Sequence, residues 1–145
     1  MTKETKTNVM LFCCAIVGAI IGKWAVSGLF TQTEEDKTQI LMEAASKINA
    51  GLPMNVDSET ILISTSGSMN NFTYNYELVE HLREDIDVSL FNEAMIPNIT
   101  NNVCTNSGME AFREMGITIT YRYFDSNSNE ITHIDVDTNT CSNET

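Results

Sequence analysis

Four cysteines are the residues of this chain best suited to chemistry, and their positions separate them into two pairs. Cys13 and Cys14 lie in a stretch without charges, whereas Cys104 and Cys141 belong to the polar remainder of the chain. The sequence lacks the CxxC motif that redox couples and many zinc sites use. In an oxidising compartment Cys104 and Cys141 would therefore form a structural disulfide. Closing a loop of about 38 residues would stabilise the fold by roughly 4 kcal/mol through chain entropy.

His81 lies beside Glu80 and near Glu84, so an imidazole and a carboxylate could act together in acid–base catalysis. The sequence shows no nucleophile elbow, P-loop, HExxH motif or dinucleotide fingerprint that would complete such a site. We therefore interpret His81 as a solvated residue at a helix edge, and a hydrolase is the third hypothesis. No catalytic residue and no cofactor are predicted.

Residues 125–130, with the sequence DSNSNE, place oxygen-bearing side chains at the first, third and fifth positions of a calcium loop. The sixth position is Glu130 instead of glycine, and the twelfth is Val136, which cannot supply a bidentate carboxylate. His81 and His133 fit no spacing of metal ligands. The stretch is therefore predicted to be a hairpin turn, and no metal site is predicted.

Two groups of residues could bind a partner or a ligand. Carboxylates crowd one short stretch and would attract a basic partner over a long range. These predicted partner-binding residues are Glu77, Glu80, Glu84, Asp85 and Asp87. Tyrosines at alternate positions could instead line a ligand pocket, and these are Tyr74, Tyr76, Tyr121 and Tyr123. A solvated surface and a packed core explain the same two groups without a binding function.

Hydrophobic periodicity predicts the helices that must position these residues. Apolar residues spaced by three and four predict an amphipathic helix over residues 34–50, which Thr33 caps and Gly51 follows. A second helix, capped by Asp87 or Ser89, is expected to be kinked or ended at Pro97. A short helix over residues 109–115 follows it.

Alternating and β-branched residues predict two β-hairpins, one on each side of the later helices. The four strands are expected at residues 59–65, 72–76, 117–124 and 131–136. The predicted fold class is α+β, with a transmembrane helix followed by a small antiparallel sheet of two hairpins packed with helices. The order of elements in the exported part is α-β-β-α-α-β-β.

Composition separates an N-terminal anchor from an acidic domain. The chain of 145 residues carries 20 acidic and 8 basic side chains, so its net charge of -12 argues against nucleic acid as a partner. Residues 9–30 contain one charge, Lys23, and are long enough to span a bilayer as a helix. Lys3 and Lys6 precede this span, so the N-terminus is expected in the cytoplasm.

The predicted organisation is therefore a cytoplasmic tail (1–8), a transmembrane anchor (9–30) and an exported acidic α+β domain (31–145). A signal peptide cleaved after residues 25–27 is the alternative for the apolar segment. Gly18 and Gly22 form a GxxxG motif through which two copies could pair in the membrane.

Four segments resemble a group of small membrane-anchored bacterial envelope proteins. They are LPMNVDSET (52–60), FTYNYELV (72–79), VCTNSGMEAFREMGI (103–117) and YRYFDSNSNEI (121–131). The resemblance implies export and a small α+β domain, and it supplies no active-site residues.

These observations predict a single-pass protein of the bacterial inner membrane whose periplasmic domain binds another envelope or membrane protein as an accessory subunit. The alternatives are a small-ligand carrier or sensor, and an immunity-type inhibitor of an envelope-acting toxin. The protein is not expected to be an enzyme under any of these hypotheses.

Overall fold

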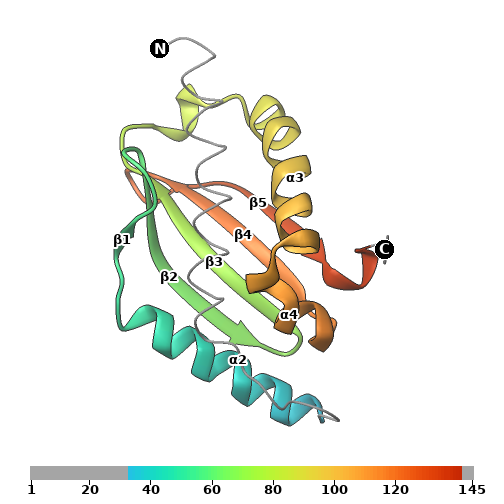
Figure 1. Ribbon diagram of the computed structural model, residues 1–145. Coiled ribbons are helices and arrows are strands. Elements are labelled where there is room, and N and C mark those ends of the chain that lie inside the picture. The colour runs from blue at the N-terminus through green and yellow to red at the C-terminus, as the bar shows by residue number, and fades with distance from the viewer. Residues whose placement is uncertain (1–32, 142–145) are drawn as a thin grey trace.

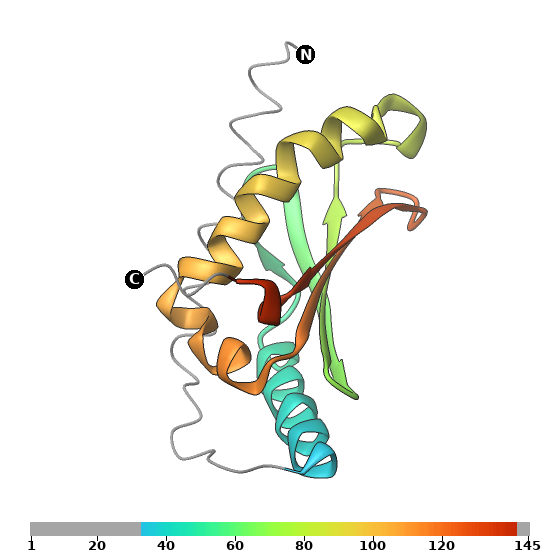
Figure 2. The same cartoon turned by 90° about the vertical axis from the view of Figure 1, so that its right-hand side faces the viewer.

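The computed structural model describes residues 33–141, which form a five-stranded sheet with helices packed on one face (Figures 1 and 2). The helices are α2 (Glu34–Asn49), α3 (Val88–Thr105) and α4 (Glu110–Met115). The strands are β1 (Met54–Asn55), β2 (Thr60–Ser68), β3 (Asn71–Leu78), β4 (Thr118–Asp125) and β5 (Glu130–Asp137).

The strands lie in the sheet in their chain order, β1-β2-β3-β4-β5. Strands β2 and β3 form one antiparallel hairpin, and β4 and β5 form the other. The two hairpins join where β3 pairs with β4 in parallel. The structure is α+β, but the prediction was wrong in its antiparallel sheet of two hairpins and in its order of elements, because the sheet is mixed and β1 adds a fifth strand. The parallel pairing follows from α3 and α4, which carry the chain back across the sheet before β4 begins.

No helix within residues 33–141 is both long and apolar enough to cross a membrane. The predicted transmembrane helix is therefore not an element of the described fold. The predicted anchor at residues 9–30, the tail at residues 1–8 and the pairing motif of Gly18 and Gly22 lie outside the described residues.

Helix α2 begins and ends close to where its sequence predicts. Thr33 and Asp36 form a capping box, in which each side chain accepts a hydrogen bond from the other residue's backbone N–H. The buried face of α2 consists of Leu41, Ala45 and Ile48, which have the expected helical spacing.

Helix α3 corrects the prediction at Pro97, since it continues through this residue as one helix of 18 residues. Pro97 lies on the exposed side of the helix. There the carbonyl that loses its intrahelical partner can bind water instead. The predicted end of the helix at Pro97 was therefore wrong.

All three helices cover the same face of the sheet. The ring of Phe91 in α3 contacts Tyr123 with centroids 5.0 Å apart, and Phe112 of α4 contacts Phe72 at 4.9 Å. The hydroxyl of Thr65, which pairs with Tyr74 across the strands, donates to the backbone carbonyl of Ala45 in α2. Figure 2 shows α3 and α4 on one side of the sheet. The core therefore lies between this face and the helices.

Gly67 in β2 allows α2 to approach the sheet closely. A Cβ atom at this position would lie 2.5 Å from the backbone oxygen of Leu41, well inside van der Waals contact. We expect Gly67→Ala to lower the free energy of unfolding by about 1–3 kcal/mol, as overpacking usually does. Urea denaturation measures this change. Gly51→Ala is the matched control, because its nearest neighbour would be 3.7 Å away. Equal effects of the two substitutions would contradict the close packing.

Candidate functional site

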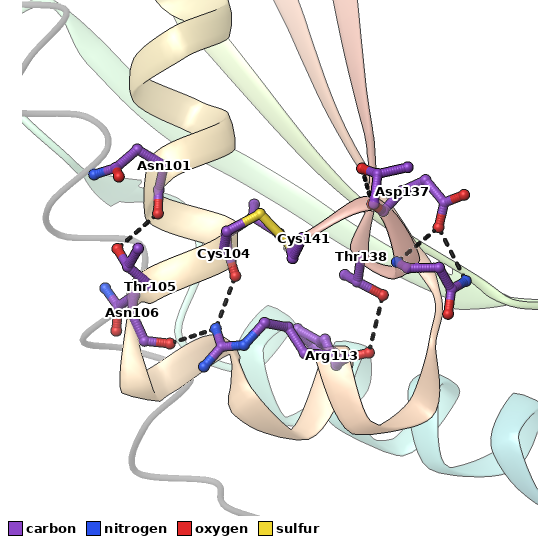
Figure 3. The surroundings of a disulfide bond; sticks show 12 residues. Asn101, Cys104, Thr105, Asn106, Arg113, Asp137, Thr138 and Cys141 are labelled. Carbon is purple, nitrogen blue, oxygen red and sulfur yellow. Dashed lines mark hydrogen bonds between the residues drawn. A yellow bond between two sulfur atoms is a disulfide. The ribbon is translucent and has the colours of Figure 1, made fainter. Parts of the chain in front are cut away.

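The disulfide predicted from the sequence is present in the structure and ties the end of the described chain to α3 (Figure 3). Cys104 and Cys141 have an S–S distance of 2.02 Å and a Cα–Cα distance of 5.2 Å. Next to it, the guanidinium of Arg113 donates to the carbonyls of Val103 and Asn106, both at 2.7 Å. This places a positive charge at the C-terminus of α3, where the helix dipole favours it.

The predicted partner-binding carboxylates form an acidic patch at the end of β3 and on the connection from β3 to α3. The patch consists of Glu77, Glu80, Glu84, Asp85 and Asp87. Glu77 is half-buried at the end of β3, and the other four residues are exposed. Asp87 is also the N-cap of α3, since its carboxylate accepts from the backbone N–H of Leu90 at 3.1 Å. The structure therefore places the five carboxylates in one continuous segment, from the end of β3 to the N-cap of α3.

The basic groups around the acidic patch are engaged elsewhere. Arg83 Nε donates to the backbone oxygen of Glu130 at 3.0 Å. Arg122 pairs with the carboxylate of Glu130, which His133 also contacts at 3.0 Å. The hydrogen bond from Arg122 holds the pKa of Glu130 below its ordinary value. None of the ion pairs found among the described residues involves a carboxylate of the patch.

Asp125 holds the β4–β5 turn next to the connection from β3 to α3. This residue is 1% exposed, and its carboxylate accepts hydrogen bonds from the backbone N–H groups of Arg83, Asn127 and Asn129 at 2.8–3.0 Å. Burial by itself would raise the pKa of Asp125, but these hydrogen bonds outweigh it and hold the pKa below its ordinary value. The same residue thus orders the β4–β5 turn and attaches the β3–α3 connection to it.

His81 is buried, so its interpretation as a solvated helix-edge residue was wrong. Its Nε2 atom lies 3.2 Å from Oε2 of Glu59, and both side chains are 11% exposed. The predicted neighbours Glu80 and Glu84 are exposed instead. The backbone oxygen of His81 accepts from Ser126 at 3.1 Å. His81 therefore joins the start of β2, the acidic patch and the β4–β5 turn.

The four tyrosines lie together on the helix-covered face of the sheet. Tyr74 and Tyr121 have ring centroids 5.3 Å apart, and Tyr76 and Tyr123 are 5.4 Å apart. Each tyrosine is at most 3% exposed. Burial, with a smaller contribution from neighbouring Tyr121, raises the pKa of Tyr74 well above its ordinary value. In the structure these rings are part of the core, and their predicted ligand role stays a prediction.

The hydroxyl of Tyr74 provides a test of how this ring is packed in the core. Within residues 33–141 it forms no hydrogen bond, although it is buried. We expect Tyr74→Phe to leave the free energy of unfolding unchanged or to raise it by up to about 1 kcal/mol, because a buried hydroxyl without a partner is unfavourable. Urea denaturation of the full chain measures this effect. A loss of more than about 1 kcal/mol would show that the hydroxyl makes a stabilising bond.

A second surface, which the sequence did not indicate, lies along the outer side of α2. It is an open groove of about 640 Å³ between this helix and the β2–β3 turn. Its lining residues are Glu34, Glu35, Thr38, Gln39, Met42, Glu43, Ser46 and Met69. The sequence did contain one signal for this surface. Met42 lies off the apolar face of α2 and Met69 lies in a turn, and both are positions where polar residues are usual.

No group of three or more His, Cys, Asp or Glu side chains in residues 33–141 is placed to hold an ion.

Part of the chain is similar in sequence to a curated protein. No protein-family model matches the chain. Protein K of Escherichia coli is 28% identical over 88 residues, which make up 59% of this chain and 47% of Protein K. The matched region therefore spans about half the length of that protein.

Three solved structures share the fold. A Pseudomonas aeruginosa protein described as secreted has a TM-score of 0.65 at 13% identity, covering 78% of this chain and all of that one. EpsS, the pilotin of the type 2 secretion system of Vibrio vulnificus, has a TM-score of 0.59 at 14% identity, covering 77% and 96%. The type II secretion system pilotin AspS from Vibrio cholerae has a TM-score of 0.55 at 9% identity, covering 74% and 94%. At these identities the similarity establishes the fold alone.

Proposed function

We propose that this protein is an extracytoplasmic accessory subunit of an envelope complex, and that it acts by binding another envelope protein and not as an enzyme. The observation that carries the proposal is the fold shared with two type II secretion pilotins, each matched over at least 94% of its length. The resemblance of four segments to small bacterial envelope proteins supports the same class of function. The proposal concerns the domain of residues 31–145 and does not depend on the predicted anchor.

The disulfide supports a location outside the cytoplasm. Structural disulfides persist in oxidising compartments and are rare in reducing ones. Cys104 and Cys141 join segments that are 37 residues apart in the sequence, so the bond constrains a large part of the domain.

The acidic patch is the surface that we assign to the partner. Four of its carboxylates are exposed, and Arg83 is the one Lys or Arg residue within residues 77–87, so the segment carries an excess of negative charge. A cluster with an excess of one sign raises the association rate with a surface of the opposite sign and adds specificity. The partner is therefore expected to present lysine or arginine to the β3–α3 connection.

In-cell cross-linking tests the proposal. The full chain is cross-linked in its native host, purified from detergent-solubilised envelopes, and analysed by quantitative mass spectrometry. We expect one envelope protein in near-stoichiometric amount. Purification of the chain alone, or only with cytoplasmic proteins, would overturn the proposal.

A further inference from the structure

The groove along α2 presents two exposed apolar side chains. Met42 is 58% exposed on the helix, and Met69 is 82% exposed at the tip of the β2–β3 hairpin. Both line the same groove of about 640 Å³. Methionine side chains are flexible and polarisable, so they adapt to apolar groups of different shapes.

Met69 occupies a backbone conformation that suits it poorly. Met69 and Asn70 have φ values of 44° and 66°, so both central residues of this tight turn are left-handed. Asn and Gly favour this region, whereas an unbranched side chain such as methionine adopts it at a cost. Strained backbone positions cluster at ligand-binding and switch regions of proteins.

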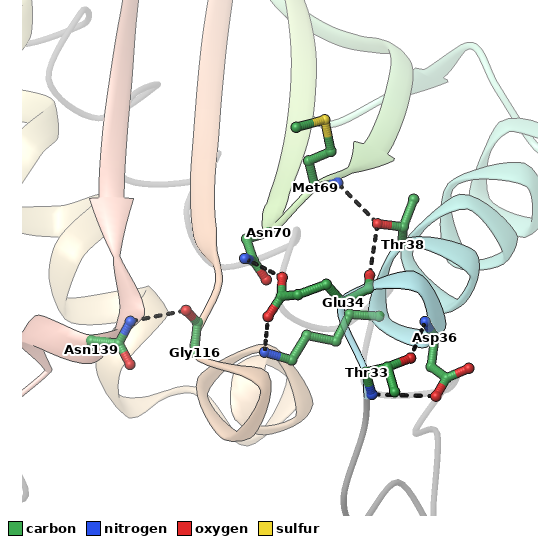
Figure 4. A network of polar contacts seen from close by, with 9 residues as sticks. Thr33, Glu34, Asp36, Thr38, Met69, Asn70, Gly116 and Asn139 are labelled. Atoms are coloured by element: carbon green, nitrogen blue, oxygen red, sulfur yellow. Dashed lines mark hydrogen bonds and ion pairs between the residues drawn. The ribbon is translucent and has the colours of Figure 1, made fainter.

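The hairpin tip is attached to α2, so the groove is formed before any partner arrives. The backbone N–H of Met69 donates to the hydroxyl of Thr38 at 3.3 Å. The amide of Asn70 donates to the carboxylate of Glu34 at 2.6 Å. Figure 4 shows both contacts joining the turn to the N-terminal half of α2. Preorganisation of this kind reduces the entropic cost of binding.

All charged residues that line the groove are acidic. Glu34, Glu35 and Glu43 line it, and its lining includes no Lys, Arg or His. Lys37 neutralises part of this charge through Glu34, at 3.3 Å. The chain as a whole has a net charge of -12, so a second copy or an anionic lipid surface would be repelled. Charge complementarity therefore favours a cationic occupant.

We infer that this groove binds a segment of a partner protein that presents an apolar side chain flanked by lysine or arginine. Met42 and Met69 would contact the apolar side chain, and Glu35 and Glu43 would receive the flanking cations. The inference rests on the proposed function, because it takes the occupant to be a protein, but it concerns a surface distinct from the acidic patch.

The test uses the full chain and a short, fluorescently labelled amphipathic peptide of leucine and lysine. A peptide of the same pattern with glutamate in place of lysine is its counterpart. Fluorescence anisotropy is expected to show binding of the lysine peptide, weakened by salt, and none of the glutamate peptide. Met69→Asn should weaken binding at least about tenfold, as loss of an anchoring side chain does. Because asparagine suits the left-handed turn, this variant should unfold at the same or a higher urea concentration than the wild type.

Leu90→Gln is the matched control, since Leu90 is 51% exposed on α3 and lies outside the groove lining. It should bind the lysine peptide as the wild type does. Equal affinities of wild type, Met69→Asn and Leu90→Gln for the lysine peptide would overturn the inference that the groove binds it. General attraction to an acidic protein would then explain the binding. Equal binding of the two peptides, or self-association that Met69→Asn abolishes, would also overturn it. If the envelope partner is still captured in cells, the proposed function stands without the groove.

Discussion

Replacing Cys104 and Cys141 together with serine is expected to lower the free energy of unfolding by about 4 kcal/mol. The bond joins residues separated by 37 positions and closes a loop that contains α4, β4 and β5. Without it the unfolded chain gains conformational freedom that the folded domain does not. Urea denaturation of the full chain under non-reducing conditions measures the difference.

Two comparisons sharpen the disulfide experiment. Wild-type protein treated with a reductant should unfold at the same urea concentration as the double serine variant. An unchanged midpoint in the variant would contradict the stabilising role of the bond. Free thiols at both positions in protein taken from its native compartment would contradict the proposed location outside the cytoplasm.

Reversing the charge of the acidic patch is expected to reduce partner capture at least about tenfold. The variant is Glu80→Lys, Glu84→Lys and Asp85→Lys, three exposed residues whose carboxylates cap no helix. Glu77 and Asp87 are left unchanged because the first is half-buried and the second caps α3. The measurement is the yield of the cross-linked envelope partner relative to the purified chain.

A matched triple variant controls for net charge. Glu110 and Glu114 are exposed residues of α4, and Glu93 is an exposed residue of α3 beyond its first turn. None of them belongs to the acidic patch, and their replacement by lysine changes the net charge equally. This control should retain wild-type capture. Equal losses in the two variants would mean that overall charge, and not the patch, attracts the partner.

The elements that the sequence predicts well are those whose signals are local. Helix α2 was expected over residues 34–50 and spans Glu34–Asn49, because its cap, apolar face and stop lie within one segment. Likewise, the alternation in residues 72–76 predicts one buried face, and Phe72, Tyr74 and Tyr76 are each at most 1% exposed.

The features that the sequence did not predict depend on contacts between distant segments. The parallel pairing of β3 with β4 joins residues such as Tyr74 and Tyr121, which no local pattern relates. The burial of His81 depends on Glu59, 22 residues earlier. The groove on α2 exists because Met69 meets Thr38 across 31 residues. Hydrophobic periodicity contains no information on such pairings.

The central claim is that the exported domain binds an envelope protein through its acidic patch. Site-specific photo-cross-linking in living cells tests it most directly, with the photoreactive residue at position 84 in one strain and at position 114 in another. The account predicts an adduct with one envelope protein from position 84 and none from position 114. Equal adducts from both positions, or no adduct from position 84, would contradict it.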